Sequence, residues 1–292
     1  MDFTYEKTAS LTEALHLKAR YGERGVFVVG GTDLLVDIRN DTLPIKPQVI
    51  IDISELTEIN YIKLENGNVR IGAGTKIADI QKSSIVKGNA LVLVKACREF
   101  ANPLIKNRAT LGGNLVNASP AADMAPPLLV LGARVMLKNV NQERELPLED
   151  FLLAIKQTAQ DNDELLTEIK FETPKNRQFE LLKLGQRNGT SIAIASLAIG
   201  FDVVDGVIRA SKIAVGSVAP TPIRAYNAEV VLNGVEPSPG NIRKAGDALK
   251  KEVNPITDIR GADEYRREMV AQLLMMAFQN LGYGRGEPGD TQ

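Results

Sequence analysis

The chain has 292 residues, of which 44% are hydrophobic and 24% charged, with a net charge of −1. This length allows two domains, and the near-neutral charge gives no electrostatic reason to expect nucleic acid or an anionic membrane as a partner. The sequence has neither a bilayer-length apolar stretch nor a secretory signal, so we expect a cytoplasmic protein. The single cysteine, Cys97, excludes an intrachain disulfide and an iron–sulfur cluster held by this chain alone.

The first 175 residues mix helices with short strands. A capping box, Ser10-Leu11-Thr12-Glu13, predicts a helix that ends at Gly22. Asn66-Gly67, between two short apolar runs, predicts a β-hairpin with strands at 61–64 and 68–71. Apolar and periodic segments predict the remaining elements, which are strands at 26–29, 49–53, 133–137 and 165–171 and helices at 34–38, 77–83, 90–100 and 126–131.

A polar, proline-containing stretch at 173–176 predicts a domain boundary. Asp205-Gly206 predicts a tight turn between two of the strands that follow. Beyond residue 282 the chain is rich in glycine and polar residues, and we expect it to be disordered. Between these points the pattern predicts strands at 179–185, 192–204 and 207–217 and helices at 227–232, 242–250 and 263–281.

Several patterns associated with enzyme chemistry are incomplete. Gly72-Ala73-Gly74 begins like a dinucleotide fingerprint but lacks the third glycine. The one histidine, His16, lies in a predicted amphipathic helix, where we expect it to face solvent or to be partly packed rather than to join a catalytic triad or hold a metal. We expect two carboxylate pairs to be solvated in loops or helix starts: Glu143/Glu145 and Glu149/Asp150. If the chain is an enzyme, its reactive centre comes from a cofactor.

Two glycine pairs carry most of the information. Gly30-Gly31 follows a predicted strand and precedes Thr32-Asp33, and Gly112-Gly113 lies in the segment from Thr110 to Asp123. Each is interpreted as a turn that places unshielded backbone N–H groups beside a small hydroxyl residue, as an anionic diphosphate requires. A strand-to-helix turn and a hairpin turn without a ligand are the alternatives. Together the two pairs favour a nucleotide-type ligand.

Five motifs, in order, resemble the FAD-binding (medium) subunit of the molybdenum hydroxylases, which include xanthine dehydrogenase and carbon monoxide dehydrogenase. They are VVGGTDLL, FANPLIKNRATLGGNLVNASPAADMAP, DELLTEI, LLKLGQRNGTSIAIA and VGSVAPTPIRA. The resemblance covers about residues 3–281 and implies an α+β fold. Residues 1–175 would form an FAD-binding domain of the vanillyl-alcohol-oxidase type, with lobes at about 1–57 and 58–175 and the flavin between them. Residues 176–281 would form a carbon monoxide dehydrogenase flavoprotein-like domain with a three-stranded antiparallel sheet and helices, and 282–292 a flexible tail.

The resemblance also implies which residues bind FAD. Asp123 would accept hydrogen bonds from the adenosine ribose, and Phe100 and Ala101 would lie beside the adenine. Leu165 would pack on the isoalloxazine ring, while Lys183 near its pyrimidine edge would stabilise the negative charge of the reduced flavin. The diphosphate would contact Val29, Gly30, Gly31, Thr32, Asp33, Leu34, Thr110, Gly113 and Asn114.

Each of these assignments has a simpler alternative. Phe100 and Leu165 are equally suited to a hydrophobic core, and Lys183 to a water-facing strand position. Arg187 belongs to the same motif as Lys183 but has no assigned role. The motif departs from the family after Arg187, where Asn188-Gly189-Thr190-Ser191 stands in place of a segment that often carries an acidic residue.

The resemblance implies a flavin subunit that works within a larger complex. A large subunit would carry molybdopterin and a small subunit [2Fe–2S] clusters, in a dimer of heterotrimers. This chain would bind FAD non-covalently and pass electrons to NAD⁺, a quinone or another acceptor. The single Cys97 excludes an extra [4Fe–4S] cluster, and the single histidine argues against a metal site built on imidazoles, so we expect no metal on this chain. A stand-alone FAD-dependent oxidoreductase and a non-catalytic scaffold subunit remain as alternatives.

Overall fold

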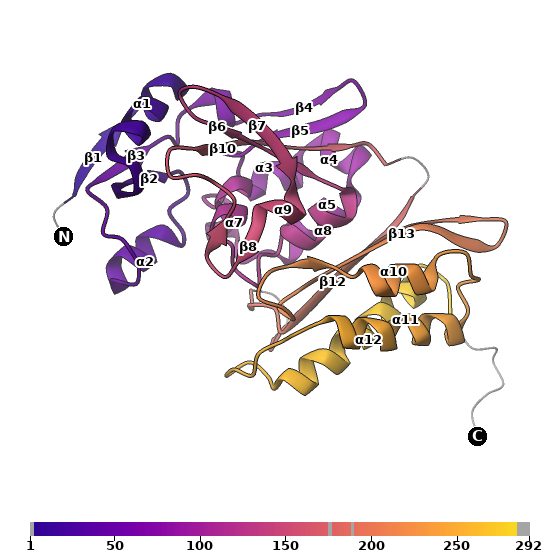
Figure 1. The fold of residues 1–292 in the computed structure, drawn as a ribbon. Helices are drawn as coiled ribbons and strands as arrows, with labels where there is room; N and C mark the ends of the chain where they lie inside the picture. The colour runs from indigo at the N-terminus through magenta and orange to yellow at the C-terminus, as the bar shows by residue number, and fades with distance from the viewer. Residues whose placement is uncertain (1–2, 175–176, 188–189, 285–292) are drawn as a thin grey trace. The chain divides into compact units, whose positions relative to one another are not determined.

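A computed structural model describes residues 3–174, 177–187 and 190–284 (Figure 1). Its contacts divide the chain into two compact units. The N-terminal unit comprises residues 1–89, 101–118 and 132–173, and the C-terminal unit comprises 90–100, 119–131 and 174–292. Two segments that precede residue 174 therefore pack with the C-terminal part of the chain. At three of the passages between units the backbone turns through a residue with positive φ: Ala101 (27°), Ala118 (43°) and Gly132 (69°).

The N-terminal unit begins with a small parallel sheet. Its strands β1 (Thr4–Lys7), β3 (Val49–Asp52) and β2 (Gly25–Val28) lie in the order β1-β3-β2. Helix α1 (Leu11–Tyr21) packs its apolar side against this sheet, and its cap is confirmed because the Ser10 side chain accepts from the Glu13 N–H at 3.2 Å. His16 on this helix is exposed, as predicted. A 3-10 turn, η1 (Gly22–Arg24), and helix α2 (Leu34–Asn40) flank β2.

A second, antiparallel sheet has the strand order β4-β5-β10-β6-β7. The predicted hairpin is confirmed as β4 (Ile62–Glu65) and β5 (Asn68–Gly72). The other strands are β10 (Leu165–Glu172), β6 (Arg134–Lys138) and β7 (Glu143–Pro147). Near it lie η2 (Thr57–Ile59), α3 (Ile77–Lys82), α4 (Ser84–Asn89), α6 (Pro103–Lys106), α7 (Leu111–Val116), α9 (Leu148–Phe151), β8 (Leu152–Ala154) and β9 (Gln157–Thr158).

The location of Glu143 and Glu145 differs from the prediction. Both residues lie on β7 rather than in a loop, and Glu145 pairs with Arg134 and Lys170. Arg134 lies on β6 and Lys170 on β10, and β6 pairs with both β7 and β10, so the sheet brings these charges together. No local sequence pattern reveals this arrangement.

The C-terminal unit is built on an antiparallel sheet of β11 (Gln178–Leu184), β12 (Ala195–Val204), β13 (Val207–Gly216) and β14 (Ile223–Arg224). The first three strands and the Asp205-Gly206 turn were predicted, and both turn residues have positive φ. The predicted three-stranded sheet was wrong by one strand, because two-residue β14 is too short to show periodicity and forms by pairing with β13.

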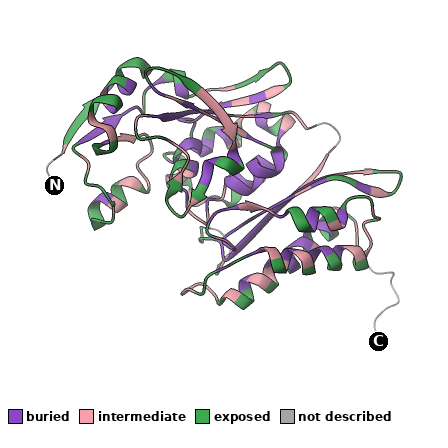
Figure 2. Cartoon of the chain, in the orientation of Figure 1, coloured by how far each residue is buried: buried purple, intermediate pink, exposed green. Residues whose placement is uncertain are grey.

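Helices cover this sheet. On one side, α10 (Tyr226–Leu232), α11 (Pro239–Glu252) and α12 (Asp263–Asn280) enclose a core formed with alternate residues of β12, including Leu197 and Phe201. Helices α5 (Leu91–Glu99) and α8 (Ala125–Leu131) also contact the sheet. Most of β12 and the inward sides of the helices are buried in Figure 2, whereas the end of the β12–β13 hairpin is exposed. The predicted disordered tail lies outside the described residues from 285 onward. Within the described part, no helix combines the length and apolar composition that crossing a membrane requires.

Candidate functional site

The first glycine pair follows β2 and leads into α2. Gly31 has φ +66°, which side-chain-bearing residues rarely adopt. At Gly30 a Cβ atom would lie 2.3 Å from the carbonyl oxygen of Arg108, so only glycine fits this backbone contact. Val29, before the pair, packs against the apolar core beneath α1, and Leu34 is the first residue of α2. The loop is therefore held at both ends by regular structure.

The backbone of this loop offers hydrogen-bond donors. Within the described part of the chain, the N–H groups of Gly30, Gly31, Thr32 and Asp33 have no protein acceptor. The carbonyl groups of the loop are used, since Leu35 N–H donates to Gly31 and Val36 N–H to Asp33. Consecutive N–H groups next to a left-handed glycine form a concave anion site. Such a set of donors fits the oxygens of a diphosphate, and the contact of this loop with FAD stays a prediction.

The second glycine pair was wrongly interpreted as a turn. Gly112 and Gly113 lie in helix α7, and Thr110 is its N-cap, with its hydroxyl oxygen accepting from Gly113 N–H at 3.1 Å. A Cβ at Gly112 would come within 2.6 Å of the Ala73 Cβ. Glycine is needed here because a helix packs closely against another segment, and not because the chain turns.

This helix has little backbone left to bind a ligand. Leu111 N–H donates to Thr75, Gly112 N–H to Ala73 and Asn114 N–H to Thr110, at 2.8–3.1 Å. Donors to a ligand must therefore be side chains. The Thr110 hydroxyl accepts from Gly113 and can still donate its own proton. Asn114 is partly exposed one turn further along the helix.

The structure brings the two predicted segments together. Gly30 lies against the backbone of Arg108 and Ala109, immediately before Thr110, and Arg108 Nε donates to the Gly30 carbonyl at 3.3 Å. The Arg108 side chain is exposed beside the free N–H groups. Sequence reasoning missed this residue. No local pattern indicated it, because its position beside the loop depends on a contact with Gly30, 78 residues earlier in the chain.

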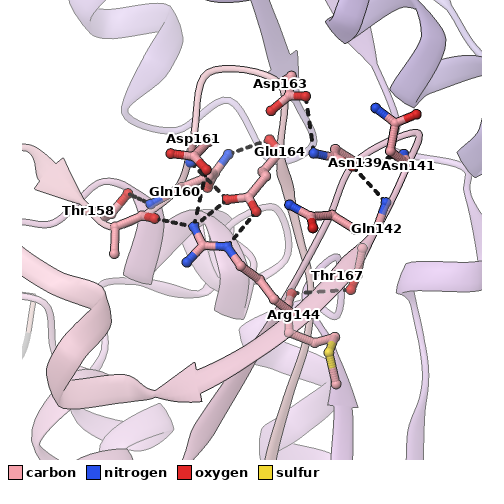
Figure 3. A network of polar contacts seen from close by, with 12 residues as sticks. Asn139, Asn141, Gln142, Arg144, Thr158, Gln160, Asp161, Asp163, Glu164 and Thr167 are labelled. Atoms are coloured by element: carbon pink, nitrogen blue, oxygen red, sulfur yellow. Dashed lines mark hydrogen bonds and ion pairs between the residues drawn. The ribbon is translucent and has the colours of Figure 1, made fainter.

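Leu165 begins β10 and is 6% exposed, packed in the same apolar cluster as Leu15 and Ile51. A polar network around Glu164 holds the chain immediately before β10 (Figure 3). Arg144 donates to both Glu164 carboxylate oxygens at 2.6 and 2.7 Å. The structure thus places Leu165 in a core, and its contact with the flavin ring stays a prediction.

The adenine-side pair lies where the chain leaves helix α5. Phe100 is 7% exposed, and Ala101 has positive φ. An alanine with φ of 27° is strained, and such strain concentrates at functional sites. The contact of either residue with adenine stays a prediction.

In the C-terminal unit, Lys183 and Asp123 form an ion pair. Lys183 projects from β11, and its Nζ lies 2.8 Å from the Asp123 carboxylate and 3.0 Å from the Glu99 carbonyl. The side chains are 6% and 17% exposed, respectively. Burial raises the pKa of Asp123 above its ordinary value; the Lys183 charge opposes this shift and the Glu99 charge adds to it. The water-facing alternative for Lys183 is therefore wrong.

A cavity of about 350 Å³ adjoins Lys183. It is lined by Lys183 together with Glu99, Leu184, Gly185, Arg187, Thr190 and Ser191. Part of the departing motif, Asn188-Gly189, lies outside the described residues.

The ion pair conflicts with the two predicted roles of its members. The adenosine ribose and the pyrimidine edge of the flavin are separated by the whole diphosphate in an extended FAD. Two side chains 2.8 Å apart cannot serve both ends of such a molecule. Both contacts stay predictions, and an extended FAD is compatible with only one of them.

Comparisons with known proteins identify the family of this chain. Residues 1–174 match a family described as the FAD binding domain in molybdopterin dehydrogenase, and residues 180–281 match the CO dehydrogenase flavoprotein C-terminal domain. The chain is 31% identical to the glyceraldehyde dehydrogenase medium chain of Sulfolobus acidocaldarius, over 96% of this chain and 98% of the relative. It is 28% identical to the carbon monoxide dehydrogenase medium chain of Hydrogenophaga pseudoflava, over 97% and 98% of the two chains.

Solved structures show the same likeness. A structure of carbon monoxide dehydrogenase from Hydrogenophaga pseudoflava superposes with a TM-score of 0.92 at 28% identity, covering 96% of both chains. A structure of the Cu,Mo-containing CO dehydrogenase gives 0.91 at 26% identity, covering 96% of this chain and 97% of the other. The chain thus has a mixed fold of helices and strands, with an FAD-binding domain and a C-terminal domain as predicted, while the vanillyl-alcohol-oxidase type of the first domain stays a prediction. The chain belongs to the FAD-binding medium-subunit family of the molybdenum hydroxylases, and it is an oxidoreductase subunit.

Proposed function

We propose that this chain is the electron outlet of a three-part molybdenum hydroxylase. It accepts electrons from a small [2Fe–2S] subunit onto non-covalently bound FAD and passes them to NAD⁺ or another acceptor. A large molybdopterin subunit oxidises the organic substrate. The observation that carries the proposal is the loop whose four consecutive N–H groups find no acceptor among the described residues, and which lies against the segment that leads to Thr110.

The loop of Val29–Leu34 binds the diphosphate of FAD in this proposal. Its N–H groups donate to the phosphate oxygens, and the Thr110 hydroxyl and the Asn114 side chain add donors from α7. Arg108 adds a positive charge beside the loop, which favours an anionic ligand. Gly113 keeps the first turn of α7 unobstructed, since a Cβ there would lie 2.9 Å from the Thr110 hydroxyl.

Lys183 holds the pyrimidine edge of the flavin ring. FAD supplies reversible two-electron chemistry when bound. The buried ammonium group stabilises the negative charge that reduction places on that edge, and the Glu99 carbonyl and Asp123 fix its position. No residue of this chain acts on the organic substrate, which agrees with the incomplete catalytic patterns of the sequence.

The relatives support the subunit role by their names. Two of them are a medium chain and an FAD-subunit of dehydrogenases, which implies further chains in those assemblies. We extend this to large and small partner subunits here, arranged as a dimer of heterotrimers.

One preparation from the native host tests the proposal. Its absorption spectrum, subunit masses and molybdenum content should show flavin, two further chains and molybdenum, and acid precipitation should release FAD into solution. Colourless protein that takes up no FAD would contradict it and indicate a scaffold. A flavin-loaded single chain that oxidises an organic substrate without partners would instead support the stand-alone oxidoreductase.

A further inference from the structure

The Asp123–Lys183 pair is shielded and internally fixed. The two residues are 60 positions apart, on the segment before α8 and on β11. Lys183 donates to two acceptors in the same unit, Asp123 and the Glu99 carbonyl, and its side chain is 6% exposed. A buried ion pair is costly to desolvate and seldom the most stable choice at its position. The presence of such a pair next to a cavity indicates that its charges act on a bound ligand.

The two charges have opposite effects on a nearby anion. An ammonium group favours negative charge on a neighbouring ring, and a carboxylate 2.8 Å from the ammonium cancels part of that attraction. Arg187 and Glu99 also line the cavity, but their side chains are exposed and more strongly screened. Among the charged residues that line the cavity, Lys183 is therefore the least screened, and Asp123 is its ion-pair partner.

We infer that Asp123 is a positioning residue and the counter-ion of Lys183, and that it lowers the flavin reduction potential rather than binding the adenosine ribose. This inference rests on the proposed contact of Lys183 with the flavin. It resolves the conflict between the two predicted roles, because both side chains then act at one end of the cofactor. A lower reduction potential would make the reduced flavin a stronger electron donor, which favours transfer of its two electrons to the acceptor.

The reduction potential of FAD in the complete complex tests the inference. Asp123→Asn should raise the potential and Lys183→Met should lower it. We expect at least about a tenfold change in the equilibrium constant for two-electron reduction in each case, equivalent to a shift of at least about 30 mV. Asp247→Asn on α11, away from the cavity, is the matched control and should leave the potential unchanged.

The dissociation constant of FAD is measured on the same variants. Under the counter-ion role, Asp123→Asn retains FAD while its potential rises. Weaker FAD binding with no rise in potential would overturn the inference and favour the ribose contact. If Asp123→Asn folds poorly, Asp123→Ser serves as the second variant, since its hydroxyl still accepts from Lys183.

The two proposals fail separately. A lowered potential in Lys183→Met with no rise in Asp123→Asn refutes the counter-ion role alone. An unchanged potential in Lys183→Met removes Lys183 from the flavin, and with it this inference. FAD binding that is lost only on changing the Gly30-Gly31 loop would still support the FAD site itself.

Discussion

Gly30→Ala probes the contact between the two FAD-binding segments. The new Cβ would lie 2.3 Å from the Arg108 carbonyl oxygen and 3.1 Å from the Ala109 Cα, where ordinary contacts are about 3.4–4 Å. One backbone must move by about 1 Å. The Arg108–Ala109 backbone is a poor candidate, because both N–H groups donate to Ile105 and the Ala109 carbonyl accepts from Ile77. We therefore expect the glycine loop to shift.

This shift should cost about 1–3 kcal/mol of folding free energy, as overpacking usually does. It also misplaces the four unpaired N–H groups, so FAD affinity should fall by at least about tenfold, equivalent to about 1.4 kcal/mol. Thermal unfolding of the apoprotein and flavin-fluorescence titration measure the two effects. Gly88→Ala is the control: its Cβ meets nothing within 4 Å in helix α4, and it should be neutral or stabilising by up to about 1 kcal/mol. Wild-type affinity and stability in Gly30→Ala would refute the reasoning.

Three further changes test other parts of the site. Thr110→Val should lower the free energy of unfolding by about 1 kcal/mol, because Gly113 loses its cap, and should weaken FAD binding. Thr110→Ser should retain both the stability and the FAD affinity. Equal FAD affinity in the two variants would show that the hydroxyl does not bind FAD. Arg108→Gln should weaken FAD binding and flatten its dependence on ionic strength, and an unchanged salt dependence would show that the guanidinium lies outside the reach of the diphosphate. Arg144→Met should destabilise the fold by about 2 kcal/mol, because it leaves the buried Glu164 unpaired while Arg144 itself is partly exposed. Burial acts to raise the pKa of Glu164, but hydrogen bonds from Arg144 and from the Asp161 N–H outweigh it and hold that pKa below 4.5. The difference in unfolding free energy between wild type and Arg144→Met should therefore be constant above about pH 5 and shrink at lower pH. A difference that grows on acidification would contradict the pairing.

The sequence determined the features that depend on neighbouring residues. The Ser10 cap, the Asn66-Gly67 hairpin and the Asp205-Gly206 turn follow from local backbone chemistry, and each lies where the pattern predicts. The Gly30-Gly31 loop was also recognisable, since its left-handed glycine and its place after a strand are local properties. The order of five motifs was sufficient to identify the family.

Tertiary structure decided the features that depend on residues far apart in the chain. Gly112-Gly113 resembles a turn in sequence but is helical, because Thr110 caps it and Ala73 leaves no room for a side chain. The short pairing of β14 with β13 was equally hidden. The ion pair of Asp123 with Lys183 spans 60 positions, and its geometry changes what each residue can do. Such contacts arise from packing between elements, and the spacing of residues along one element does not encode them.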